Sequence, residues 1–147
     1  MIRPARLEDV DALLDIEHRC FHHDRLHAPD FRNAIKGKST VLLVAVAEGK
    51  VRGYALLRVL KTRARLLSLA VDPRARRSGL GRALIHAVEG QAAARGAEHM
   101  RLELRERNRG AHALYVSLGY HQDGRLLEYY SDKSDARLMK KRLGEKA

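Results

Sequence analysis

Apolar and polar residues follow two different periods along this chain. Residues 7–16 repeat apolar positions at helical spacing, which predicts a first helix that runs to about Phe21. Residues 40–47 and 51–60 are instead apolar runs rich in β-branched side chains, separated by a turn at Glu48-Gly49-Lys50. That arrangement is typical of a β-hairpin.

The same reasoning divides the rest of the chain into alternating strands and helices. In HMRLELRER, Met100, Leu102 and Leu104 alternate with charged residues, as in a strand with one buried face. The further predicted elements are a strand at 1–3, a short helix at Phe31–Ile35, a strand at Arg65–Val71, a helix at Leu80–Arg95, a strand at His99–Arg107, a helix at Ala111–Leu118, and strands at Tyr120–Tyr130 and Ala136–Leu143. A length of 147 residues without a linker, repeat or low-complexity tract predicts one domain, 1–147, of mixed α/β class.

A basic, glycine-containing loop joins the strand that ends at Val71 to the helix that starts near Leu80. The first amides of a helix lack intrahelical acceptors, and the helix dipole makes that end positive. Glycine lets the backbone approach a ligand closely. Main-chain amides across this loop therefore predict a phosphate site, formed by Arg76, Arg77, Ser78, Gly79, Leu80, Gly81 and Arg82.

Two common phosphate-binding loops do not fit this segment. The nucleoside-triphosphate loop requires Gly-Lys-Ser/Thr, which the chain lacks. The dinucleotide fingerprint requires a third glycine or alanine where Leu84 stands, and no acidic residue follows at the required interval. A strand-turn-helix with a purely structural role stays open as the alternative.

The loop and a second motif resemble the GCN5-related N-acetyltransferases. Arg76-x-x-Gly79-x-Gly81 is similar to the acyl-CoA loop of that family, and the segment Asn108–Tyr120 is similar to its N-x-x-A-x-x-L-Y-x-x-x-G-Y pattern. Within the family, the segments LELRERN and ALYVSLGY are most similar to the type that acetylates the N-terminal alanine of ribosomal proteins. The resemblance implies a mostly antiparallel sheet of about seven strands, flanked by about four helices, whose central strands splay apart.

The resemblance also implies roles in the transfer of acetyl from acetyl-CoA to a primary amine. Glu103 would be the general base, directly or through a water, although Arg101 and Arg105 flank it; Tyr115 would be the general acid for the leaving thiolate. Asn108 would contact the cosubstrate, cap a helix, or do both. Leu69 and Val71 would pair with the pantetheine arm, and a bulge near Leu69 or Ala70 would supply an oxyanion donor.

The acceptor is most simply a protein N-terminal α-amine, and a small-molecule amine is the alternative acceptor. A non-catalytic module that binds acyl-CoA or nucleic acid is the alternative to an enzyme. An N-terminal amine has a pKa near ~8, against ~10.4 for lysine, so it needs less help to lose its proton. Direct transfer is favoured over an acyl-enzyme, because no Cys-His-Asn signature surrounds Cys20.

The charge is strongly positive and uneven. The formal net charge is +11; residues 61–147 carry 19 Lys and Arg against 10 Asp and Glu, whereas residues 1–60 carry 10 against 8. This excess suits a polyanionic cosubstrate, and it leaves room for ribosome or RNA contact. Aromatic residues make up only 5%, so base stacking on single strands is not expected.

The remaining features concern metal binding, membrane insertion and cellular location. The segment His18–His27 is rich in His around Cys20, but it lacks paired zinc-ligand spacing, so we expect a mobile substrate mouth and no metal. No apolar run is long enough to span a membrane. One cysteine and no signal peptide favour a cytoplasmic protein, either a monomer or a homodimer.

Overall fold

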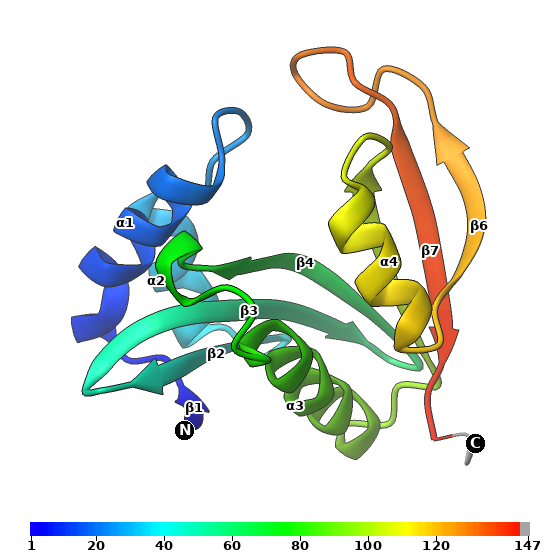
Figure 1. The fold of residues 1–147 in the computed structure, drawn as a ribbon. Helices are drawn as coiled ribbons and strands as arrows, with labels where there is room; N and C mark the ends of the chain where they lie inside the picture. The colour runs from blue at the N-terminus through cyan, green and yellow to red at the C-terminus, as the bar shows by residue number, and fades with distance from the viewer. Residues whose placement is uncertain (145–147) are drawn as a thin grey trace.

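Seven strands join in one sheet, in the order β1-β2-β3-β4-β5-β7-β6 (Figure 1). The computed structural model describes residues 1–144. The strands are β1 (Ile2–Pro4), β2 (Thr40–Ala47), β3 (Lys50–Leu60), β4 (Arg63–Val71), β5 (His99–Arg105), β6 (His121–Leu126) and β7 (Ala136–Arg142), and the helices are α1 (Val10–Cys20), α2 (Ala28–Lys36), α3 (Leu80–Ala94) and α4 (Arg109–Ser117). The predicted fold class is confirmed, although residues 145–147 of the predicted domain lie outside the described part.

Differences from the predicted elements lie at their ends. The predicted strand Tyr120–Tyr130 stops at Leu126, because Glu128 adopts a φ of 50° and its amide donates to the Asp135 carboxylate at 2.9 Å. The predicted helix Phe31–Ile35 begins earlier, at Ala28, where the His27 amide donates to the carboxylate of Asp30 at 2.7 Å. Local side-chain hydrogen bonds therefore set these boundaries.

The predicted hairpin is confirmed, with a two-residue turn. Ala47 pairs directly with Lys50, and the two residues between them, Glu48 and Gly49, have φ values of 54° and 74°. Positive φ at both central positions matches the strand twist, which is why tight hairpins use it.

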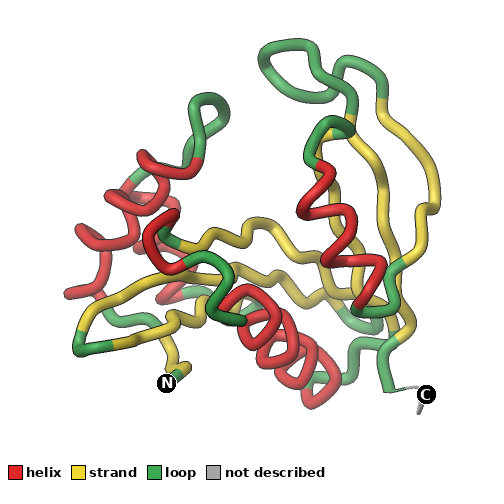
Figure 2. Tube along the Cα trace, in the orientation of Figure 1, coloured by secondary structure: helices red, strands yellow, loops and turns green. Residues whose placement is uncertain are grey.

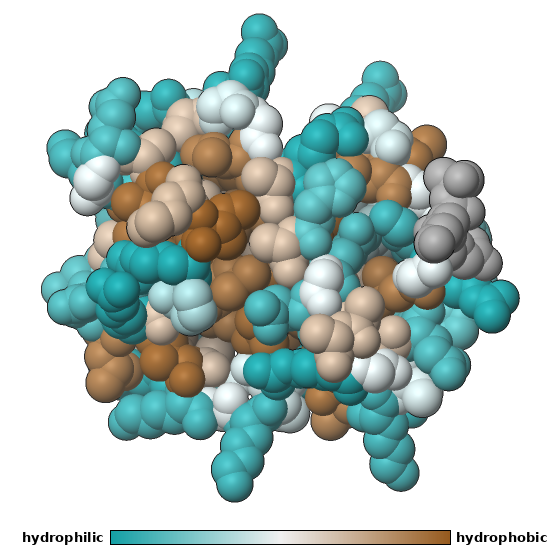
Figure 3. Space-filling model, turned by 90° about the horizontal axis from the view of Figure 1, so that it is seen from below, coloured by the Kyte–Doolittle hydropathy of each residue, from teal (hydrophilic) through white to brown (hydrophobic). Residues whose placement is uncertain are grey.

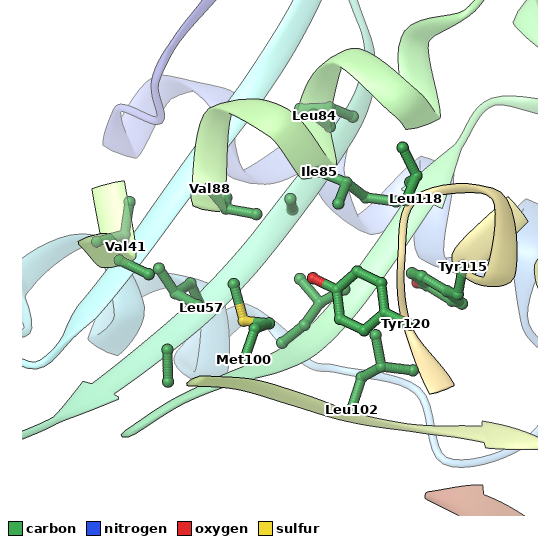
Figure 4. Packing of buried hydrophobic residues seen from close by; sticks show 14 of the residues in the cluster. Val41, Leu57, Leu84, Ile85, Val88, Met100, Leu102, Tyr115, Leu118 and Tyr120 are labelled. Carbon is green, nitrogen blue, oxygen red and sulfur yellow. The ribbon is translucent and has the colours of Figure 1, made fainter. Parts of the chain in front are cut away.

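Two apolar layers cover opposite faces of the sheet. On one face, Leu84, Ile85 and Val88 of α3 pack with residues of α4 and of the central strands, including Met100 and Leu102 (Figure 4). On the other face, α1 and α2 cover β2, β3 and the far end of β4, with buried residues such as Leu13, Phe31 and Tyr54. The second layer contains no residue of β5, β6 or β7, so that half of the sheet carries helices on one face only.

The sheet opens between β4 and β5, which are the only parallel neighbours among the described strands. Their pairing runs from Arg63 opposite His99 to Leu66 opposite Leu102 and then stops. Beyond that point β4 follows β3, whereas β5 follows β7, so the strands separate (Figure 1). The predicted splay is confirmed.

The bulge in β4 lies earlier than predicted. Leu66 pairs with Leu57 and Ser68 pairs with Leu56, which leaves Leu67 as the extra residue. The sequence placed the bulge near Leu69 or Ala70, and that position is wrong. A bulge bends its strand, and this one falls where β4 leaves β5.

The surface mixes apolar and hydrophilic residues. Seen from below, apolar side chains reach the surface near the middle, and long hydrophilic side chains project around the rim (Figure 3). Among residues 1–144, no helix has the length and apolar character needed to cross a membrane.

Candidate active site

A cavity of about 680 Å³ lies where β4 and β5 part. Its walls come from the end of α1, the α1–α2 loop, both parted strands, α4 and the β6–β7 loop. The two loops lie at the same end of the molecule, although they are far apart in sequence (Figure 2). Phe21, His22, His23 and Asp24 of the His-rich segment line the cavity, and the role of this segment as a mobile substrate mouth stays a prediction.

The predicted phosphate loop forms a chain of main-chain amides without acceptors. Arg77 and Gly79 adopt φ values of 64° and 80°, and the first helical hydrogen bond of α3 runs from Ala83 to the Gly79 carbonyl at 3.0 Å. Outside the helices and strands, no hydrogen bond from the amides of residues 76–82 is found among residues 1–144. Exposed amides at a helix start provide the geometry that binds phosphate oxygens.

Side chains of the loop leave this cradle open. The Ser78 hydroxyl donates to the Ala75 carbonyl, and Arg82 donates to the Ser117 hydroxyl at 2.9 Å. A Cβ added at Gly81 would lie 3.7 Å from Leu114 and Val71 and meet nothing closer. The loop is therefore not filled by the protein itself.

A buried carboxylate anchors the strand end that precedes the loop. Asp72 accepts from the Arg74 amide at 2.9 Å and from the Arg74 guanidinium at 2.9 and 3.1 Å. The bonds from Arg74 lower the pKa of Asp72 to about 2. Because the Asp72 amide donates to Arg52 on β3, this anchor joins the loop to the sheet.

The open edge of β4 exposes alternate main-chain groups. Asp72 bonds toward β3, so Ala70 also faces β3, whereas Leu69 and Val71 face the gap. The Val71 carbonyl accepts from the Cys20 thiol at 3.3 Å, which is consistent with this orientation. Of the two residues predicted to lie near the oxyanion donor, the alternation leaves Leu69 on the open edge and turns Ala70 away.

Glu103 lines the cavity and pairs with an arginine that the sequence did not indicate. Its carboxylate lies 3.1 Å from the Arg65 guanidinium, which also donates to the Tyr129 hydroxyl at 3.1 Å. The flanking Arg105 points elsewhere, toward Asp24 and Asp132. Since Arg65 is 38 residues away, only the sheet pairing brings it beside Glu103.

Tyr115 is buried and reaches the cavity from α4. The residue is 6% exposed, and its ring packs edge-on against Tyr120 at a centroid distance of 5.5 Å (Figure 4). Burial, with a smaller contribution from Tyr130, raises the pKa of Tyr115 well above its ordinary value. Its hydroxyl has no hydrogen-bond partner in the described chain, so it stays protonated and can donate to a ligand.

Asn108 caps α4 and also lines the cavity. Its side-chain oxygen accepts from the Ala111 amide at 3.0 Å. The capping alternative is thus confirmed, and the side-chain amide NH₂ stays available to the cavity because the cap uses only the oxygen.

An arginine joins the two loops over the cavity. Arg105 lies 3.3 Å from Asp24 on the α1–α2 loop and 2.8 Å from Asp132 on the β6–β7 loop, and it stacks 4.1 Å above the Tyr130 ring. The Ser131 amide also donates to Asp24 at 3.2 Å. Any acceptor must pass beneath or beside this contact.

A second buried carboxyl group lies at the cavity wall. Glu17 accepts from the Tyr54 hydroxyl and from the Leu26 amide, the latter at 2.8 Å, and Tyr54 also bonds to Ser68 at 2.7 Å. Burial raises the pKa of Glu17. This network ties α1 and its following loop to β4 beside the bulge. Its signal in the sequence was the carboxyl group of Glu17 within an otherwise apolar helix face.

The described residues contain no group of three His, Cys, Asp or Glu close enough to hold a metal ion.

Comparisons with known proteins agree with this geometry. A family profile described as "Acetyltransferase (GNAT) family" matches residues 10–120. The "N-alpha-acetyltransferase" of Sulfurisphaera tokodaii is 32% identical over 157 aligned positions, covering 94% of this chain and 90% of that protein. The crystal structure of the ribosomal-protein-S18-alanine N-acetyltransferase from Escherichia coli superimposes with a TM-score of 0.88 at 30% identity, covering 100% of this chain and 96% of that one. Ard1 from Thermoplasma volcanium gives a TM-score of 0.91 at 28% identity, covering 99% and 98%.

The profile match spans most of the chain, and it includes both the amide loop before α3 and the segment that carries Tyr115. The parted strands, the unfilled cradle and the two matched motifs therefore have one common explanation. This chain belongs to the GNAT family of acetyltransferases.

Proposed function

We propose that this protein transfers acetyl from acetyl-CoA directly to the α-amine of a protein N terminus. One observation carries the proposal: the unpaired amides of residues 76–82 lead, along the open edge of β4, into a cavity that contains a protonated, unpartnered tyrosine. A diphosphate at the cradle and a thioester in the cavity fit this layout.

The cavity differs in charge from the molecule around it. Its lining includes six carboxyl groups against three Lys and Arg, namely Glu17, Asp24, Glu103, Glu106, Asp132 and Asp135 against Arg105, Arg107 and Lys133. The whole chain is +11. Arg65, Arg105 and Arg125 pair with five of these carboxyl groups, so the excess of carboxyl groups at the lining gives a cationic amine a modest advantage in encounter.

The residues around the cavity support a direct transfer. Glu103 is positioned to accept the proton that the amine loses, either itself or through a water, and Arg65 holds its carboxylate in place. The Leu69 amide, on the open edge, can donate to the oxygen that becomes negative as the amine attacks. Tyr115 can protonate the departing thiolate. Asn108 can donate its side-chain NH₂ to the cosubstrate.

The relatives support the choice of acceptor, since one is named an N-alpha-acetyltransferase and another a ribosomal-protein-S18-alanine N-acetyltransferase. An N-terminal α-amine, with a pKa near ~8, also needs less from a base than a lysine near ~10.4. A small-molecule amine is the second candidate, and the size of the cavity gives it support. We place the enzyme in the cytoplasm, where one unpaired cysteine is ordinary.

The experiment is acetyl-CoA turnover with matched acceptors. One peptide carries a free N terminus, a second carries the same sequence with a blocked N terminus and an internal lysine, and small amines complete the panel. We expect turnover with the first peptide alone. Equal or faster turnover with small amines would overturn the N-terminal assignment, and no turnover with any acceptor, despite heat of coenzyme A binding, would favour a binding module.

A further inference from the structure

Four cationic side chains and a histidine lie in register across five neighbouring strands. Arg58 on β3 stands opposite Arg65 on β4, which stands opposite Arg101 on β5; Arg101 stands opposite Lys140 on β7, and Lys140 opposite His121 on β6. Directly opposite residues project from the same face of a sheet. We call these five residues the cationic row.

The row is exposed on the face of the sheet opposite α3 and α4. Its strand neighbours Leu66, Leu102 and Met139 point into the core beneath α3 and α4, so the row points the other way. On that side, the layer formed by α1 and α2 stops before β5. Four of the five residues are exposed, and Lys140 is partly so.

Most of the row lacks counter-charges. Within the described chain, Arg58, Arg101 and Lys140 form no ion pair, whereas Arg65 pairs with Glu103. Elsewhere on the surface, some arginines pair with carboxylates, as Arg3, Arg19, Arg74, Arg105 and Arg125 do, and others, such as Arg32 and Arg77, form no ion pair in the described chain. Like charges directly opposite one another destabilise a sheet. Folding therefore gives no reason for this arrangement.

We propose that the cationic row binds the sugar-phosphate backbone of a nucleic acid. Adjacent strands are about 4.8 Å apart, so Arg58 to Lys140 spans about 14 Å. A nucleic-acid strand presents one phosphate per about 3.4 Å of axis, and the row thus faces about four phosphates. No aromatic residue belongs to the row, so contact is to the backbone and not through base stacking.

The row also reaches the candidate active site, because Arg65 belongs to both. If the proposed function holds, a nucleic acid on the row would lie beside the cavity that receives the protein N terminus. The fitting substrate is then a protein that is itself part of a ribonucleoprotein. The binding proposal does not depend on this link.

The test is fluorescence anisotropy with a labelled RNA duplex of about 20 base pairs, over the salt range of about 50 to 200 mM. Because Arg65 is paired with Glu103, three cations of the row are free to contact a phosphate each, which predicts a fall in wild-type affinity of about 40-fold across that range. The variant Arg58→Gln/Arg101→Gln/Lys140→Gln should reduce the salt slope by about 3. Peptide acetylation by this variant should stay at the wild-type level, because none of the three residues lines the cavity.

The matched control is Arg32→Gln/Lys36→Gln/Lys50→Gln, which removes the same charge from exposed residues elsewhere that form no ion pair in the described chain. We expect the control to keep wild-type RNA binding. Equal losses in both triple variants would show non-specific attraction and overturn the proposal, as would the absence of RNA binding by the wild-type protein. A wild-type protein that binds phosphatidylserine-containing vesicles in preference to RNA would overturn it too.

Discussion

Tyr115 is buried and also lines the cavity, and these two properties together determine what its hydroxyl can do. A phenol that is 6% exposed keeps its proton, because removing it would place a charge in an apolar environment. Tyr120, packed edge-on against it, is also buried, but its hydroxyl donates to Glu89 at 2.7 Å and is already satisfied. Two adjacent tyrosines thus differ in whether a ligand can receive their proton.

Replacing Tyr115 with Phe should reduce turnover by about 100-fold or more, since a general acid contributes at least that much. Affinity for coenzyme A, measured by calorimetry, should change little. Tyr120→Phe is the control and should retain turnover at a temperature where it stays folded. Unchanged turnover in Tyr115→Phe would remove the acid role.

Asp72 contributes pH-dependent stability. Its pKa falls from an ordinary value near ~3.9 to about 2 in the folded state. A lowered pKa stabilises the fold above about pH 4, and that contribution disappears as the pH drops toward 2. Asp72→Asn should reduce the free energy of unfolding by about 2 kcal/mol at pH 7, and less at pH 3, in urea titrations. A reduction that does not vary with pH would contradict the ionic account.

At the scale of elements, the candidate site depends on the parting of β4 and β5 and on the turn that follows β4. The parallel pairing of β4 and β5 stops after four residue pairs, and the bulge at Leu67 turns β4 away. The turn anchored by Asp72 then delivers the chain to the start of α3 with its amides free. Strand edge, cradle and cavity follow from these two breaks in regular pairing.

Gly81→Val should weaken coenzyme A binding at least tenfold in calorimetry, because its side chain would occupy the open cradle. Gly90→Val is a matched control on the same helix, where an added Cβ meets nothing within 4 Å. Both changes alter helix propensity in the same direction, with a gain of a few tenths of a kcal/mol, because valine favours a helix slightly more than glycine does. Equal binding by both variants would exclude the cradle as the diphosphate site.

At the scale of the whole molecule, repulsion between like charges opposes folding. A net charge of +11 repels itself, and the cationic row concentrates part of that repulsion on one face. The acidic cavity lies beside this face. The molecule therefore offers one anionic and one cationic surface side by side, which favours a partner that carries both charges.

Stability should rise with sodium chloride between about 0.01 and 0.5 M, because screening shortens the reach of the repulsion from about 30 Å toward a few Å. We expect a gain of about 1 kcal/mol, seen as a few degrees in Tm. The triple variant of the cationic row should be more stable than wild type at low salt, and its stability should rise less as salt is added. A wild-type Tm that falls with salt would show that ion pairs outweigh the repulsion.

The sequence by itself determined what depends on neighbours along the chain. Periodicity gave the order of helices and strands, and the glycine loop gave the cradle at 76–82, because both follow from local backbone preference and amphipathic spacing. The tertiary structure decided what depends on register. It placed Arg65 beside Glu103, moved the bulge to Leu67, and brought Asp24 to Ser131 across 107 positions. Such contacts depend on how strands align and where they part, and a linear pattern does not contain that information.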